Sequence, residues 1–194
     1  MKALSLSRPW TTAVERHGKR AENRARWTPH PHLMRQAEAA VGQDLALHSS
    51  GTYDRNGALH IEFHTGVLYG PKDTPSKAIT SVVHVAGLLH PGDPWPIGQE
   101  AWYFGDTALL FENVRTLTAP VYMPGGLGFW EVKEPYLAQV LAALPKPEET
   151  CVECNRVTDG RQRCAACRHP VCIRCATYDD DGALHCPECL EDAS

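Results

Sequence analysis

All eight cysteines of this 194-residue chain lie in its last 44 residues, where they form four C-x-x-C pairs. The pairs are Cys151/Cys154, Cys164/Cys167, Cys172/Cys175 and Cys186/Cys189. A C-x-x-C turn brings two thiolates to one side of the chain, and two such pairs complete a tetrahedral site of four sulfurs. Eight soft thiolates that leave no open ligand position are typical of structural rather than catalytic zinc. The sequence therefore predicts two structural Zn²⁺ ions.

A disulfide-stapled secreted module is the alternative interpretation of a cysteine-dense segment of this size. The sequence shows no signal-peptide pattern, no apolar run of membrane length and no cysteine before Cys151. We therefore expect reduced thiols, a cytoplasmic location and no membrane partner. A segment of about 40 residues has too small a core to fold alone, so metal binding is expected to supply its folding free energy.

The four pairs allow two arrangements around two ions. The first pair could share an ion with the second, as ribbons in series, or with the third, as a cross-brace. Only residues 168–171 separate the two middle pairs, which crowds independent modules, so we predict the cross-brace. The order and the short gap resemble the FYVE and RING group of fingers, although residues 160–165 lack the basic lipid-binding stretch of FYVE domains. His169 and His185 lie beside ligands and are expected not to bind metal.

The rest of the chain is long enough for one further domain. Residues 145–150 read Pro-Lys-Pro-Glu-Glu-Thr, in which prolines resist helix formation and charges stay solvated. We therefore expect a first domain at residues 1–144, a linker at 145–150 and the two-zinc domain at 151–194. The hydrophobic content of 43% is sufficient for a globular core.

Charge is distributed unevenly along the chain. Residues 1–35 hold eight lysines and arginines against two glutamates, whereas residues 145–194 hold six basic and ten acidic side chains. The cysteine-rich segment is therefore a poor generic clamp for nucleic acid, and the N-terminal segment is a candidate anion site. A solvated basic face is the alternative interpretation of the same charges.

Residue patterns predict short strands with few helices at the periphery. Strands are expected at residues 2–6, 44–48, 79–89 and 108–117, helices at 7–16, 33–41 and 134–144, an extended segment at 20–27, and helical or irregular chain at 53–65. Ser7 is expected to cap the first helix. This pattern is typical of an α+β fold with a small β-barrel flanked by short helices.

The N-terminal motifs resemble those of the ASCH domain, a member of the PUA-like superfamily. Residues 7–10 read Ser-Arg-Pro-Trp after the first strand, and the family signature G-x-K-x-x-E-x-R is matched by Lys19, Glu22 and Arg24. His17 replaces the first glycine of the signature, and Gly18 follows it. Residues 45–49, a strand with a histidine at its end, and residues 128–131, Gly-Phe-Trp-Glu, also fit the family.

The resemblance covers residues 1 to about 140 and implies a PUA-like β-barrel with a cleft beside the signature. It also implies a role with RNA or nucleotide-derived ligands. Our candidate ligand-binding residues are Arg8, Trp10, Lys19, Glu22, Arg24, Trp27 and His48.

These residue types suit such a ligand, although each also has a structural interpretation. A carboxylate at Glu22 fixes the donors of Arg24, and Trp10 and Trp27 could offer stacking faces. Equally, a Glu22–Arg24 pair could be structural, the tryptophans could lie in the core, and His48 could be a buried, satisfied histidine.

Three functions remain open at this point. Recognition of RNA or a modified nucleotide, with the zinc module binding a protein partner, is the favoured one. Some ASCH proteins are amidohydrolases that deacylate N4-acetylcytidine with the motif lysine, and a hydrolase using Lys19 and Glu22 is the first alternative. Here Glu22 stands where those enzymes have a threonine. A protein-binding adaptor acting through the zinc module is the second alternative.

Overall fold

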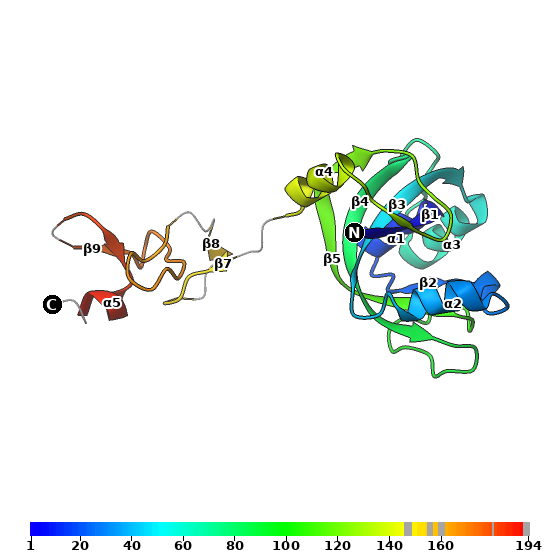
Figure 1. Cartoon of the computed structure of the whole chain (residues 1–194), viewed down its shortest axis with the longest axis horizontal. Coiled ribbons are helices and arrows are strands. Elements are labelled where there is room, and N and C mark those ends of the chain that lie inside the picture. Colours follow the sequence, from blue (N-terminus) through cyan, green and yellow to red (C-terminus); the bar gives the residue numbers. More distant parts are fainter. Residues whose placement is uncertain (146–148, 155–156, 159–161, 180, 192–194) are drawn as a thin grey trace. The chain divides into compact units, whose positions relative to one another are not determined.

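The structure is a computed structural model that describes residues 1–145, 149–154, 157–158, 162–179 and 181–191. The chain divides into two compact units, Met1–Pro145 and Lys146–Ser194, and each is described by itself (Figure 1). Residues 146–148 of the expected linker lie outside the described residues. Within the described parts, no helix has the length and apolar composition that crossing a membrane requires.

A curved, mixed sheet of six strands forms the centre of the first unit (Figure 1). Its order is β2-β5-β4-β3-β1-β6, in which β1 runs parallel to β3 and every other neighbouring pair is antiparallel. The strands are β1 (Lys2–Arg8), β2 (Ala21–Asn23), β3 (Asp44–Tyr53), β4 (Ala78–Leu89), β5 (Ala108–Tyr122) and β6 (Phe129–Glu131).

Both faces of the sheet are buried. Leu4 and Leu45 point to one face, where they pack in a cluster with residues of the first two helices. Their neighbours Ala3 and Ala46 point to the other face, where Val140 of the last helix of the unit closes a second cluster. Alternate side chains of a strand lie on opposite faces, so the runs of small and aliphatic residues in β1 and β3 fit a sheet covered on both sides.

Short helices surround the sheet. They are α1 (Trp10–Arg16), the 3-10 turn η1 (Ala25–Trp27), α2 (Pro31–Glu38), α3 (Arg55–Thr65) and α4 (Tyr136–Ala143). Helix α3 has defined ends: Asp54 Oδ1 accepts a hydrogen bond of 2.9 Å from the Gly57 N–H at its start, and Gly66 takes a φ of 74° after its last turn.

The fold class is confirmed as α+β, with a mixed sheet, short helices and a small cysteine-rich unit. Two local predictions are wrong. The segment 20–27 is extended only over β2, because the Arg24 N–H donates to the Thr107 carbonyl and the chain then turns into η1. Ser7 does not cap α1, because it belongs to β1 and Pro9 occupies the cap position without a side-chain hydrogen bond.

The second unit consists of small hairpins around a core of cysteines. Strand β7 (Glu149–Thr150) pairs with β8 (Val157–Thr158), β9 (Thr177–Tyr178) pairs with β10 (Leu184–His185), and α5 (Pro187–Glu191) follows. Val171 is buried among three buried cysteines. Aliphatic side chains are few in this core, so its stability has to come largely from what the cysteines bind.

Candidate functional site

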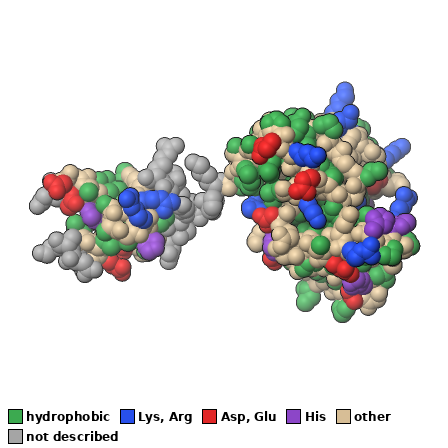
Figure 2. All heavy atoms as spheres, in the orientation of Figure 1, with side chains coloured by type: hydrophobic (Ala, Val, Ile, Leu, Met, Phe, Trp, Pro, Cys, Tyr) green, Lys and Arg blue, Asp and Glu red, His purple; other side chains and the backbone are tan. Residues whose placement is uncertain are grey.

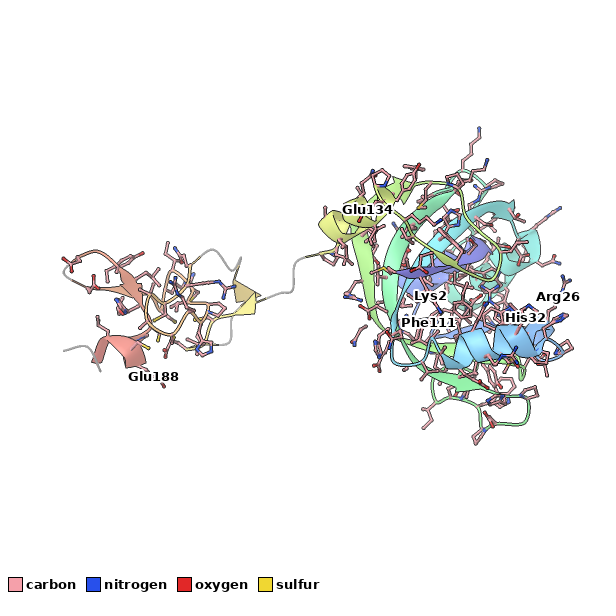
Figure 3. All side chains as sticks on the ribbon, in the orientation of Figure 1. Lys2, Arg26, His32, Phe111, Glu134 and Glu188 are labelled. Carbon is pink, nitrogen blue, oxygen red and sulfur yellow. The ribbon has the colours of Figure 1, made fainter. Side chains whose placement is uncertain are left out.

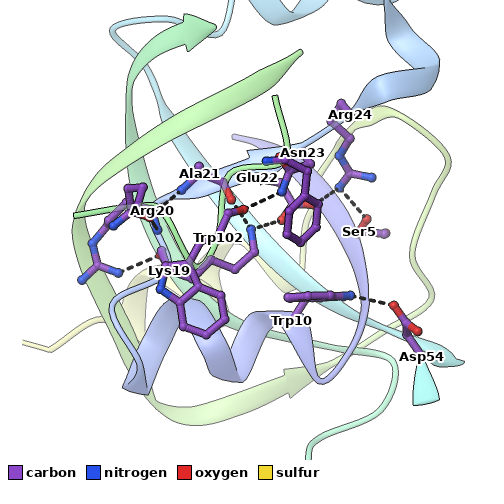
Figure 4. A network of polar contacts seen from close by, with 12 residues as sticks. Ser5, Trp10, Lys19, Arg20, Ala21, Glu22, Asn23, Arg24, Asp54 and Trp102 are labelled. Atoms are coloured by element: carbon purple, nitrogen blue, oxygen red, sulfur yellow. Dashed lines mark hydrogen bonds and ion pairs between the residues drawn. The ribbon is translucent and has the colours of Figure 1, made fainter. Parts of the chain in front are cut away.

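A chain of ionic contacts joins Lys19, Glu22 and Arg24 (Figure 4). Lys19 Nζ donates to Glu22 Oε2 over 2.6 Å, and Arg24 Nη2 forms an ion pair with Glu22 Oε1 at 3.0 Å. Lys19 is 1% exposed and Glu22 7% exposed. One buried carboxylate therefore binds two cations, one wholly buried and one partly open to solvent.

Local backbone geometry brings these residues together. Gly18, at a φ of 71°, turns the chain after α1, and Ala21–Asn23 then pairs with β5. Lys19 Nζ folds back to donate to the Ala21 carbonyl as well as to Glu22. Arg24 Nη2 also donates to the Ser5 carbonyl over 3.2 Å, so these contacts leave Nη1 of the guanidinium for other partners.

Burial lowers the pKa of Lys19 below its ordinary value, and the charge of Glu22 opposes this shift only in part. A buried ammonium loses the stabilisation of water, and the nearby carboxylate replaces some of it. The neutral form of Lys19 is consequently more accessible than that of a surface lysine.

A cavity of about 200 Å³, here called the Lys19 pocket, adjoins this buried pair. It is lined by Trp10, Lys19, Glu22, Asn23, Asp54 and Phe104. Trp10 is held in place because its Nε1–H donates to Asp54 Oδ2 over 2.9 Å, while Lys19 Nζ lies 5.6 Å from the centre of its ring. The cavity therefore combines an aromatic wall with an ion pair.

A larger cavity of about 590 Å³, here called the Arg24 pocket, lies beside Arg24. Its lining comprises Ser5, Ser7, Arg24, His48, Ser50, Gly51, Thr52, Lys77 and the segment 124–128. Arg24 and Lys77 bring positive charge, and none of the lining residues is an aspartate or a glutamate. Such a lining favours an anionic ligand.

His48 is fixed at the base of the Arg24 pocket. Its Nε2–H donates to the Met123 carbonyl over 3.1 Å, which leaves Nδ1 to accept from the Ser5 hydroxyl, also at 3.1 Å. The Trp130 Nε1–H in turn donates to Ser5 Oγ over 3.2 Å. Burial lowers the pKa of His48, so the ring is a neutral hydrogen-bonding group at neutral pH.

The structure assembles most, but not all, of the residues predicted from the sequence. Trp10, Lys19 and Glu22 line the Lys19 pocket, and Arg24 and His48 line the Arg24 pocket. The single expected cleft is therefore two neighbouring cavities, which Glu22 links because it binds a residue of each.

Two of the predicted ligand-binding residues have other positions. Trp27 is 6% exposed and packs against Phe129 with ring centroids 5.1 Å apart, so its predicted stacking role is wrong. Arg8 lines neither cavity, because its guanidinium donates to the carbonyls of Pro71, at 2.6 Å, and Gly51, at 2.8 Å. It holds the backbone beside the Arg24 pocket and contributes to the site indirectly.

Sequence reasoning missed several lining residues. Ser5, Ser50, Thr52 and Lys77 gave no local signal, because strand pairing alone brings them together. The segment 124–128, Pro-Gly-Gly-Leu-Gly, carried a usable signal, since glycines often mark a close approach of backbone to a ligand. At Gly125 the backbone approaches a side chain of the pocket so closely that a Cβ there would lie 2.4 Å from His48 Cε1.

The cysteines of the second unit form two groups of four. One group is Cys151, Cys154, Cys172 and Cys175, and the other is Cys164, Cys167, Cys186 and Cys189. The first pair thus meets the third and the second meets the fourth, which is the interleaved grouping of a cross-brace rather than that of ribbons in series.

The sulfur geometry fits tetrahedral zinc. Four sulfurs about 2.3 Å from one ion lie about 3.8 Å from one another. The Sγ atoms of Cys154 and Cys172 are 3.7 Å apart, and those of Cys167 and Cys186 are 3.8 Å apart. All eight thiols are free, and these distances are far longer than the roughly 2 Å of a disulfide bond.

Backbone N–H groups favour the thiolate form in each group. Burial raises the pKa of Cys151, but surrounding amides, that of Cys172 foremost, outweigh it and lower the pKa to about 6. The same balance lowers the pKa of Cys164 to about 5. Within the same groups, hydrogen bonds to neighbouring cysteines raise the pKa of Cys175 and that of Cys189 to about 12. The thiolate is the form that binds a metal, so a cation has to displace the protons of these thiols when it binds.

The fold and the two sites define an α+β protein with paired cavities in its first unit and two cysteine tetrads in its second. No protein-family model and no curated protein matches the sequence. Among solved structures, a crystal structure of a mutant of the ZmASCH protein from Zymomonas mobilis is similar at 12% identity and a TM-score of 0.42. The match covers 74% of this chain and 96% of that chain. The similarity is too distant to assign residue roles, which therefore come from the geometry of this chain.

Proposed function

We propose that the first unit recognises a nucleotide, free or within RNA, through the Arg24 pocket. The observation that carries this proposal is the lining of the cavity, with two cations, several hydroxyls, a neutral histidine and no carboxylate. Its volume of about 590 Å³ lies within the usual range of small-molecule sites, roughly 300–1,000 Å³. The sequence resemblance to the ASCH domain supports the same ligand class.

Arg24 and Lys77 are proposed to bind phosphate in different ways. Glu22 and the Ser5 carbonyl fix the orientation of the Arg24 guanidinium, so its remaining donors are pre-organised for a phosphate oxygen. Lys77 is exposed and contributes a mobile point charge. Ser50, Thr52 and the backbone of the glycine segment 124–128 supply neutral donors and acceptors for sugar or base.

A hydrolase acting on a modified nucleoside is the second candidate, and the state of Lys19 favours it. Lys19 lines a cavity, is wholly buried and has a lowered pKa, which are the conditions for a lysine to act as a general base. Glu22, in contact with Lys19 Nζ, would accept or return the proton. Hydrolysis of acylated nucleosides by the wild type, together with loss of this hydrolysis in Lys19→Met, would establish this activity.

For the second unit we propose two structural Zn²⁺ ions, held by the two cysteine groups, and a protein partner. Each group offers four sulfurs and no further ligand position, so the ions would stabilise the fold rather than perform chemistry. Ile173, 75% exposed, and Tyr178, 57% exposed, are apolar surface available to such a partner.

Arg24→Ala is expected to weaken binding of ribonucleoside 5′-monophosphates by about tenfold or more, because a charge-assisted contact contributes about 1.5–3 kcal/mol. The slope of affinity against salt should also fall by about one phosphate contact. Isothermal titration of a panel of the four monophosphates measures both effects.

Two further variants control this test. Arg35→Ala removes the same charge from an exposed position on α2 outside the pocket and should leave affinity unchanged. Gly125→Ala keeps every charge but forces the His48 ring to move, and it should weaken binding. Equal affinity of Arg24→Ala, Gly125→Ala and wild type would exclude the Arg24 pocket as the site.

A further inference from the structure

A row of rings lies on the surface beside the Lys19 pocket. It consists of Phe63, His64 and His60 on α3 and Phe104 from the segment before β5, and we call it the aromatic face. Ring centroids are 4.9 Å apart for Phe63 and His64, 4.6 Å for His64 and His60, and 5.3 Å for His60 and Phe104. Phe63 is 84% exposed and Phe104 51% exposed, so the row is open to solvent at both ends.

The rings rest on a buried support. Trp102, 5% exposed, lies beneath them, with its centroid 6.0 Å from that of His60 and 6.1 Å from that of His64. The His60 Nε2–H donates to the Ala101 carbonyl over 2.6 Å, which fixes the orientation of its ring. The middle of the row is therefore held in place, so binding there costs little side-chain entropy.

The aromatic face adjoins the Lys19 pocket directly and follows the lining of the Arg24 pocket along the chain. Phe104 lines the Lys19 pocket and lies 6.4 Å from Trp10, ring centroid to ring centroid. Along the chain, residues 50–52 line the Arg24 pocket, Asp54 lines the Lys19 pocket, and α3 begins at the next residue. A single segment of the chain thus runs past both cavities to the aromatic face.

We infer that the aromatic face stacks bases of a single-stranded nucleic acid whose adjoining nucleotide occupies the Arg24 pocket. This inference rests on the proposed function and narrows its ligand to a strand longer than one nucleotide. Successive rings of the row are tilted or edge-on to one another, so each base would stack on the open face of one ring. Aromatic rings suit bases, because every base has a π face and stacking tolerates any sequence. A duplex keeps its bases stacked inward, so the strand has to be single.

Phe63 provides the test, because it is exposed, lies outside the buried clusters and lines neither cavity. Phe63→Leu keeps apolar area but removes the ring, whereas Phe63→Tyr keeps the ring. Leu59→Ala, on the same helix and 48% exposed, removes apolar area outside the row. The probes are a fluorescently labelled single-stranded RNA of about eight nucleotides, a typical site size, and the unlabelled monophosphates.

Phe63→Leu should weaken binding of the oligonucleotide at least about fivefold, the lower end of the stacking effect of one base. It should leave affinity for monophosphates unchanged, and Phe63→Tyr and Leu59→Ala should bind both probes as wild type does. Oligonucleotide affinity that is unchanged in Phe63→Leu would overturn the inference.

Two other outcomes separate the alternatives. The wild type could self-associate, with Phe63→Leu and Leu59→Ala both reducing this association and neither changing oligonucleotide affinity. That result would identify a protein interface and overturn the inference. If Phe63→Leu weakens oligonucleotide binding and Arg24→Ala binds the oligonucleotide as wild type does, the stacking face would be retained. The Arg24 pocket would then be rejected as the site of the adjoining nucleotide.

Discussion

Chelation of the metal should unfold the cysteine-rich unit and leave the first unit folded. Structural zinc contributes about 10–16 kcal/mol of apparent binding free energy per site in small fingers, far more than the few aliphatic contacts around Val171 can supply. The first unit has its own buried clusters on both faces of its sheet, so we expect it to fold without a metal. Two-dimensional NMR of the intact chain before and after chelation measures both units at once.

Metal analysis of freshly purified, reduced protein should return two zincs per chain. Cys164→Ser should disturb the group containing Cys186 while leaving the group of Cys151 and Cys172 formed, because the two groups share no ligand. One ion per chain would contradict two zinc sites. Loss of both cysteine groups in Cys164→Ser, when the matched Arg168→Ser variant retains both, would contradict their independence.

Glu22→Gln should destabilise the first unit by about 3–5 kcal/mol at neutral pH, because it leaves the buried Lys19 ammonium without its counter-charge. The pKa of Lys19, already lowered by burial, should then fall further. Between that lowered pKa and the unfolded value of about 10.4, the unfolded chain binds more protons, so the free energy of unfolding rises with pH. Urea denaturation across this range measures the effect.

The double variant Lys19→Met/Glu22→Gln is the control for this loss. It removes both buried charges and should be more stable than Glu22→Gln alone, because no uncompensated ammonium remains. A Glu22→Gln protein with wild-type stability would show that Lys19 is not charged in the folded protein. Stability that falls as pH rises through the window would show that folding raises the pKa of Lys19 rather than lowering it, and would contradict this account.

The parts of the structure that depend on local pattern could be predicted from the sequence. The C-x-x-C spacing indicated two four-sulfur groups, and the short gap at residues 168–171 favoured the interleaved arrangement that the structure has. Alternation in residues 2–6 and β-branched runs at 79–89 and 108–117 located three of the central strands. Each of these signals lies within a few residues of the feature it predicts.

The parts that depend on tertiary contacts could not be predicted. Trp27 has the composition of a stacking residue, but the turn at Arg24 directs it into the core against Phe129. The Arg24 pocket combines residues from β1, β3 and the segment 124–128. The pairing of β1 with β3, and of β1 with β6 just after the segment, brings these together. Lys77 has no motif around it and lines the pocket because it directly precedes β4.

The charged patch predicted at the N-terminus is likewise divided by the fold. Figure 2 shows Lys, Arg and His side chains together at the edge of the first unit where Figure 3 labels Arg26 and His32. Arg20, by contrast, donates to the carbonyls of Val14 and Lys19. Net charge over a segment indicated an anion site but not which cations form it.

A crystal structure of the intact protein with a ribonucleoside 5′-monophosphate tests the proposed function most directly. We expect the phosphate within hydrogen-bond distance of Arg24 Nη1 and near Lys77, with the sugar or base against the glycine segment 124–128 and His48 still bound to the Met123 carbonyl. A nucleotide bound elsewhere, with the Arg24 pocket holding only water at saturating ligand, would contradict nucleotide recognition by this cavity.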